Sequence, residues 1–129
     1  MEYGQLQRLI FVRRKIMFMN WLILIIAGLF EVGFTTCLNF ANQSSGRAFA
    51  GWIAGFLLTL AASMFLLYKA TSGTHALPLG TGYAVWTGIG AVGTVLTGIL
   101  FFKEPVHFWR IFFLFTLIAS VVGLKVASH

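Results

Sequence analysis

Four long apolar runs occupy most of this chain and restrict the folds that it can adopt. They cover residues 20–38, 48–69, 77–102 and 108–126. A helix of about 20 residues rises about 30 Å, which matches the hydrocarbon core of a bilayer. Each run is therefore predicted to form a transmembrane helix, and the chain to be an all-α integral membrane protein with four such helices in each protomer.

Composition agrees with this fold class, because 59% of the residues are hydrophobic, only 9% are charged, and the mean hydropathy is +0.90. Such values are not expected of a soluble domain. The connections between the runs, such as residues 39–47 and 103–107, are too short for a soluble catalytic domain. We therefore expect a function within the membrane and no enzymatic activity.

The first 18 residues differ from the rest because they mix apolar and basic side chains. They contain four of the nine basic residues, Arg8, Arg13, Arg14 and Lys15. We predict a basic N-terminal extension at 1–18 and a four-helix transmembrane domain at 19–127. Two other interpretations stay open: this segment begins a signal peptide, or translation starts at Met17 or Met19 and the extension is not made.

The distribution of Lys and Arg predicts the orientation, since the basic side of a membrane protein faces the cytoplasm. With four helices, six basic residues lie on the side of the two termini and three on the other side. This distribution favours an orientation with both termini in the cytoplasm. Without the extension the count becomes two against three, so the start site decides whether the topology is fixed or dual.

Glu31 is the only acidic residue within these runs, and it lies near the middle of the first one. An ionised carboxylate is costly in hydrocarbon, so an acid there marks a functional site. A carboxyl group in this position can hold either a proton or a cation, and we predict that Glu31 binds the two alternately. Gly28, Phe34 and Thr35 share its helix face.

The third run carries a stripe of aromatic and hydroxyl side chains, Tyr83, Trp86 and Thr87, followed by Gly90. Aromatic faces attract cations, so the stripe is a candidate pocket wall; packing or interfacial anchoring explains the aromatic residues equally well. Ser63, in the second run, is either an interhelical hydrogen-bonding residue or a ligand contact.

Gly88, Gly90 and Gly93 match the dinucleotide-binding pattern G-x-G-x-x-G. That pattern needs a strand before it and a water-accessible turn, whereas these glycines lie inside an apolar run. We therefore assign them a packing and conformational role, because small residues let helices approach closely in membranes.

Other ligand classes find little support in the sequence. His75, His107, His129 and the single Cys37 do not have the spacing of a metal site, so we expect no metal and no cofactor. The basic residues lie at helix ends, where they set topology and contact headgroups, so nucleic acid is not an expected partner. We expect protons, a small organic cation and the lipid bilayer. Because four helices hardly enclose an aqueous path, we also expect at least a dimer.

Three segments carry a family resemblance: LPLGTGYAVWTGIGAVGTVLTGILFFKEP at 77–105, WLILIIAGLFEV at 21–32 and GLK at 123–125. The chain resembles the small multidrug resistance family, and more closely its guanidinium exporter (SugE-like) subfamily. The resemblance implies an antiparallel dual-topology dimer in the bacterial inner membrane, which exports a small cation against protons by alternating access. The domain at 19–127 is then a transporter domain.

The resemblance also implies roles for individual residues. Glu31 would be the proton and cation site, and Tyr83, Trp86 and Ser63 would line the pocket and orient that carboxylate. Gly28 would leave room for the substrate, and the glycine-rich third helix would bend as the dimer switches sides.

The sequence departs from the subfamily at several positions. Phe34 replaces the usual Trp, Asn39 replaces the usual Lys, TGY replaces TAY, and short insertions occur at about 41–45 and 72–75. Without this Trp the binding site lacks an indole N–H donor, one of the groups that could select guanidinium. Three functions stay open: export of guanidinium or small guanidinyl cations, broader export of quaternary ammonium compounds, and a structural role in a heterodimer.

Overall fold

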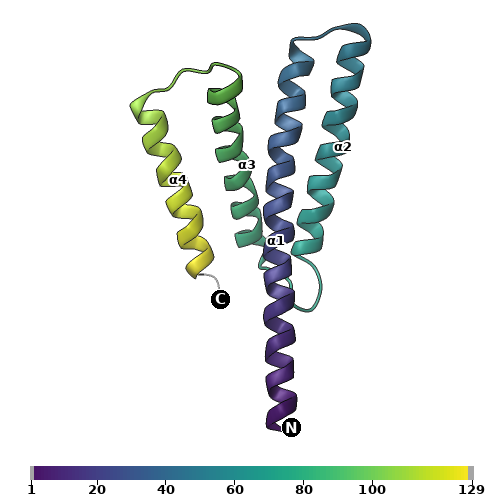
Figure 1. Ribbon diagram of the computed structural model, residues 1–129, viewed down its shortest axis with the longest axis vertical. Coiled ribbons are helices and arrows are strands. Elements are labelled where there is room, and N and C mark those ends of the chain that lie inside the picture. The colour runs from purple at the N-terminus through teal and green to yellow at the C-terminus, as the bar shows by residue number, and fades with distance from the viewer. Residues whose placement is uncertain (1, 128–129) are drawn as a thin grey trace.

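The computed structural model describes residues 2–127, so Met1 and residues 128–129, including His129, lie outside the described residues. It contains four helices, α1 (Tyr3–Asn42), α2 (Gly46–Ala70), α3 (Leu79–Phe101) and α4 (Phe108–Ala127), and no strand within 2–127 (Figure 1). All four are long and apolar enough to cross a membrane. The predicted all-α, four-span membrane fold is confirmed.

Short connections with distinctive backbone features join the helices. Gly73 adopts a φ of +97° in the connection between α2 and α3, which a glycine tolerates because it has no Cβ. Pro78 directly precedes α3, where a residue without an amide donor costs nothing. In the connection between α3 and α4, Lys103 has a φ of +54°.

Helix α1 is much longer than the predicted range 20–38. Its 40 residues correspond to about 60 Å, twice the hydrocarbon thickness. The prediction followed hydropathy, whereas helix formation depends on backbone propensity, and residues 3–19 contain no proline that would stop the helix. The predicted domain boundary at residue 19 lies inside this continuous helix and stays a prediction.

Helix α1 lies at the centre of the bundle, in contact with α2 and α3, and α4 packs against α3 (Figure 1). The buried core lies where α1, the end of α2 and the beginning of α3 meet, and Leu24, Leu67, Leu77 and Trp86 belong to it. Asn20 donates a hydrogen bond of 2.9 Å to the His75 carbonyl oxygen, which attaches the connection between α2 and α3 to α1.

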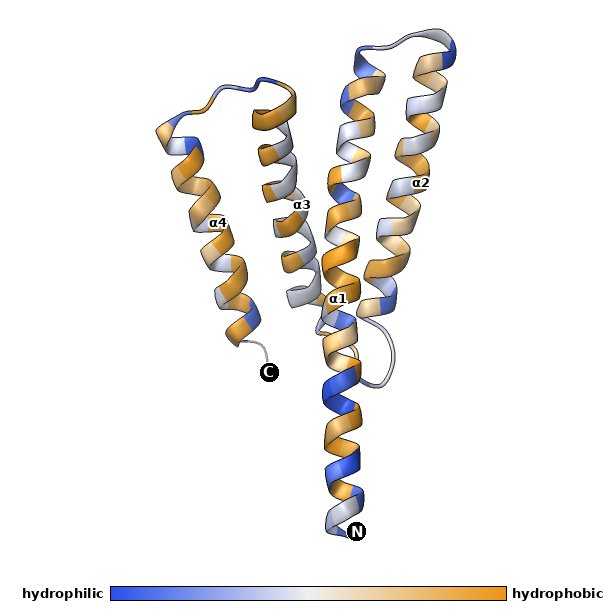
Figure 2. Ribbon diagram, viewed as in Figure 1, coloured by the Kyte–Doolittle hydropathy of each residue, from blue (hydrophilic) through white to orange (hydrophobic). Residues whose placement is uncertain are grey.

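Most large apolar side chains point outward, especially along α4, where Phe108, Trp109, Phe113 and Phe115 are exposed. Figure 2 shows hydrophobic residues along all four helices, with hydrophilic residues in the first part of α1 and near the helix ends. A surface of this kind is stable against lipid or another apolar helix. The chain is thus a multi-pass membrane protein, which in a bacterium lies in the inner membrane.

Candidate cation site

Glu31 lies on α1, and its carboxylate rests directly against Gly90 of α3. A Cβ atom at position 90 would overlap the carboxylate, so this glycine creates the space that the acid occupies. The Oε2 atom of Glu31 is buried and has no hydrogen-bond partner among residues 2–127. A buried carboxylate oxygen without a partner is costly, so this atom is suited to receive a proton or a cation.

The other glycines of the predicted set serve close helix packing. Gly93 faces Val32 of α1, and Gly88 faces Val121 of α4. Because the two contacts lie on different sides of α3, this helix approaches both neighbours closely. Gly28 is also a contact point, since a Cβ there would lie 2.8 Å from the Cβ of Ile89. Within one protomer, the space beside Gly28 is therefore filled by α3.

Ser63 and Trp86 form a hydrogen-bonded chain between three helices. The Trp86 indole nitrogen donates to the Ser63 hydroxyl at 2.9 Å, and that hydroxyl donates to the Ala27 carbonyl oxygen at 2.7 Å. Ser63 is fully buried. Of the two interpretations of Ser63, the structure shows the interhelical hydrogen bond. The chain ends one turn before Glu31, so it fixes the α1 backbone that carries the acid.

Tyr83 and Phe34, two further predicted site residues, make different aromatic contacts. The Tyr83 ring is 5.5 Å from the ring of Trp86, yet Tyr83 is 55% exposed whereas Trp86 is 5% exposed. Phe34 packs edge-to-face on Phe56 of α2 at 5.8 Å. Tyr83 is thus free to face a ligand or a second copy, and Phe34 contributes to the contact between α1 and α2.

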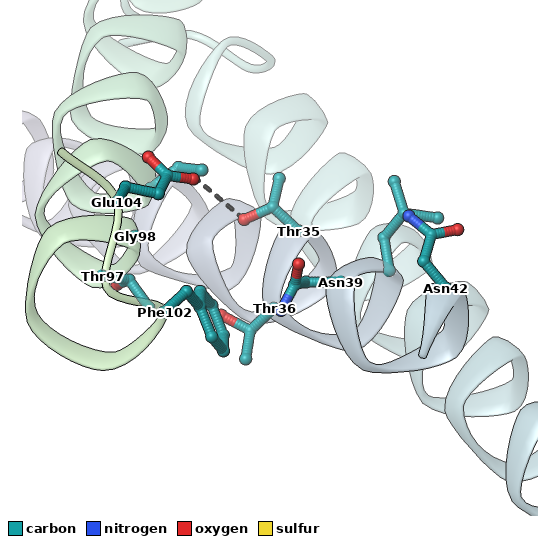
Figure 3. Close-up of a pocket in the computed structure, with 10 residues that line it drawn as sticks. Thr35, Thr36, Asn39, Asn42, Thr97, Gly98, Phe102 and Glu104 are labelled. Carbon is teal, nitrogen blue, oxygen red and sulfur yellow. Dashed lines mark hydrogen bonds between the residues drawn. The ribbon is translucent and has the colours of Figure 1, made fainter. Parts of the chain in front are cut away.

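Thr35 begins a polar cavity one helical turn beyond Glu31. Its hydroxyl donates to the Val32 carbonyl oxygen and shares a 2.9 Å hydrogen bond with the Thr94 hydroxyl of α3 (Figure 3). The cavity has a volume of about 200 Å³. Its lining comes from the last turns of α1 and α3 and from the segment after α3: Thr35, Thr36, Leu38, Asn39, Asn42, Thr94, Thr97, Gly98, Phe102 and Glu104.

This cavity was not predicted as a whole, although Thr35 was. The sequence pattern identifies Asn39 only as a departure from the subfamily, and it does not identify Thr94 or Thr97 as site residues. A signal was present, because Thr87, Thr94 and Thr97 follow the helical period in the third run. The Thr87 hydroxyl and the Asn39 amide nitrogen are both buried without a hydrogen-bond partner in the described part of the chain.

Metal binding has no support from the arrangement of side chains. Within residues 2–127, no three His, Cys, Asp or Glu side chains come together in a group that could hold a metal ion. Among the described residues, Glu31 is therefore part of no such group.

Comparison with known proteins finds matches that cover most of the chain. The sequence profile described as "Small Multidrug Resistance protein" matches residues 19–118. A probable guanidinium efflux system subunit GdnD from Bacillus licheniformis is 46% identical over 111 residues, which is 85% of this chain and 100% of the relative. A guanidinium exporter from Yersinia pseudotuberculosis is 46% identical over 110 residues, with 85% and 100% covered. The GdnD protein of Bacillus subtilis is 40% identical over 111 residues, with 85% and 99% covered.

Proposed function

Because the chain belongs to the small multidrug resistance family, we propose that it exports guanidinium or small guanidinyl cations in exchange for protons by alternating access. The observation that carries the proposal is the Glu31 carboxylate, held against Gly90 with its Oε2 atom buried and unpaired among the described residues. The names of relatives up to 46% identical support guanidinium as the substrate.

A single carboxylate can couple the transport of protons to that of cations, because the two compete for it. In a low-dielectric site its negative charge needs a partner, and either a proton or a guanidinium ion supplies one. Guanidinium is planar and donates two parallel hydrogen bonds to a carboxylate. Since proton and cation cannot occupy the same oxygens together, transport of one in each direction follows if the site opens to one side at a time.

We further propose that two copies pair in antiparallel orientation, so that two Glu31 carboxylates share one transport path. Tyr83, at 55% exposure, and the exposed apolar face of α4 are available for contacts between the copies. Ser63 and Trp86 act by fixing the helices around the site. Gly88, Gly90 and Gly93 let α3 shift between its two neighbours.

The test is guanidinium-driven proton movement in proteoliposomes that contain this chain alone. We expect coupled flux in the wild type and its loss in Glu31→Gln. Glu2→Gln is the matched control, because it also removes one carboxylate but lies outside the membrane-spanning part, at the beginning of α1. Flux that persists in Glu31→Gln would disprove the role of Glu31.

Two alternatives have distinct outcomes in the same assay. Flux driven by a quaternary ammonium ion as strongly as by guanidinium would indicate a broad-range exporter, which the replacement of the usual Trp by Phe34 permits. The relatives named as subunits of an efflux system favour a heterodimer as the second candidate. In that case the folded wild-type chain shows no flux by itself and gains flux when a paralogue is added.

A further inference from the structure

Glu104 lines the polar cavity from the segment that follows α3. Its backbone amide donates a 3.1 Å hydrogen bond to the Gly98 carbonyl oxygen. Its carboxylate lies against Gly98, where a Cβ atom would be 2.5 Å from the carboxyl carbon. The absence of a side chain at position 98 thus lets the acid reach the cavity wall beside Thr97 and opposite Asn39 and Asn42 (Figure 3).

The electrostatic surroundings of Glu104 favour a cation. The cavity is bounded by the C-terminal ends of α1 and α3, and each such end carries a partial negative charge of about half an electron. Of the described helices, α2 and α4 have a Lys in the last turn, whereas α1 and α3 have no basic residue there. Lys103 is exposed and lies outside the cavity lining.

The cation that the structure places on Glu104 is itself a guanidinium group. Arg110 of α4 pairs through Nη2 with a Glu104 carboxylate oxygen, and its Nη1 donates a 2.9 Å hydrogen bond to the Pro105 carbonyl oxygen. The two side chains are 29% and 45% exposed. An exposed ion pair is weak, so a free cation of the same shape can compete with Arg110 for the carboxylate.

We propose that the Glu104 carboxylate is a second binding site for planar guanidinium-type cations, at which a free cation competes with the side chain of Arg110. The Thr94 and Thr97 hydroxyls line the cavity between this site and Thr35, one turn from Glu31. A cation released at Glu104 therefore meets a polar wall on its way to or from the central carboxylate. The substrate class assigned to this site rests on the proposed function.

The test measures guanidinium binding in protein that lacks the central carboxylate. Glu31→Gln protein is titrated with ¹³C-labelled guanidinium at constant ionic strength, and binding is followed by line broadening of the carbon signal. We expect saturable weak binding. Adding Glu104→Gln should weaken it at least tenfold, whereas adding Arg110→Gln should strengthen it up to about fivefold, which is the equivalent of about 1 kcal/mol.

Both substitutions break the same ion pair, so comparing them distinguishes a binding site at Glu104 from a general loosening of the segment. If the segment after α3 simply loosened, both variants would bind more weakly; competition predicts opposite directions. Lys103→Gln, which changes the charge of the same segment, should change binding less than twofold. Tetramethylammonium should not displace guanidinium, because it has no N–H donors for the carboxylate.

Equal binding with and without Glu104→Gln, or weaker binding in both variants, would overturn the second site. Such a result beside coupled flux in the wild type would leave the proposed function in place. Conversely, a wild type without flux, beside Glu104-dependent binding in the Glu31→Gln protein, would refute an exporter that acts alone and leave the site.

Discussion

Gly90 is the residue whose substitution tests the central site most directly. In Gly90→Ala the new methyl group overlaps the Glu31 carboxylate, and overpacking of this kind costs about 1–3 kcal/mol. We expect the guanidinium-driven proton flux to fall about tenfold or more, while the helix itself gains propensity. Gly80→Ala is the control on the same helix, because a Cβ atom there meets nothing within 4 Å. Equal flux in the two variants would show that the carboxylate does not depend on this contact.

Ser63 provides a second test, of stability rather than transport. Ser63→Ala leaves the buried Trp86 indole N–H without its acceptor and removes the bond to the Ala27 carbonyl. Interhelical hydrogen bonds in membranes contribute about 0.6 kcal/mol on average and up to about 1.7, so a loss of about 1 kcal/mol is expected in denaturant unfolding. Thr116→Ala, whose hydroxyl bonds only within α4 as the structure shows it, should lose less. A smaller loss for Ser63→Ala than for Thr116→Ala would contradict the interhelical role.

Sequence reasoning identified Glu31 because an acid in an apolar run is conspicuous without any knowledge of packing. It could not assemble the polar cavity, because Thr35, Asn39 and Thr94 meet only when the rotation of α1 relative to α3 is known. Glu104 lies outside the predicted runs and outside the observed helices, yet the contact with Gly98 brings it to the cavity. The sequence pattern indicates which helix faces are polar, but it does not indicate which of these faces meet in the folded protein.

At the scale of elements, α1 consists of two parts with different surroundings. The first part, residues 3–16, is exposed all round, whereas the part from residue 20 onward packs on α2 and α3. Hydropathy predicted the second part because burial in lipid requires apolar residues. It was silent on the first part, since an exposed helix of mixed composition has no distinguishing period. The four-helix order itself followed from run length and was fully predictable.

This division predicts unequal protection along a single helix. An isolated helix of about 15 residues is marginally stable in water, so the amides of residues 3–16 should exchange with deuterium at least tenfold faster than those of residues 24–40 in detergent. Hydrogen-exchange mass spectrometry of the full chain measures both segments in one experiment, and the second segment is the internal reference. Equal protection would mean that a lipid surface or a partner covers the first part.

At the scale of the whole molecule, we predict that the extension controls which way the chain inserts. Its four basic residues account for the bias of six against three on the side of the termini. When all four are replaced by Gln, the count becomes two against three and the bias nearly disappears. We expect the wild type to insert mainly with its termini inside, and the four-Gln chain to insert in both orientations in comparable amounts.

Orientation is measured at Thr74, which is exposed in the connection between α2 and α3. Thr74→Cys in a Cys37→Ala background is labelled with a membrane-impermeant maleimide before and after permeabilisation. Labelling in intact cells should be low with the extension unchanged and should approach half in the four-Gln chain; a matched chain with Arg47→Gln and Lys103→Gln should stay low. An antiparallel pair needs one protomer in each orientation, so in the wild type the proposed pair of two copies is limited by the minority that inserts with its termini outside, and without that minority the heterodimer alternative applies. Low labelling in the four-Gln chain would show that the helices themselves, and not the extension, determine the orientation.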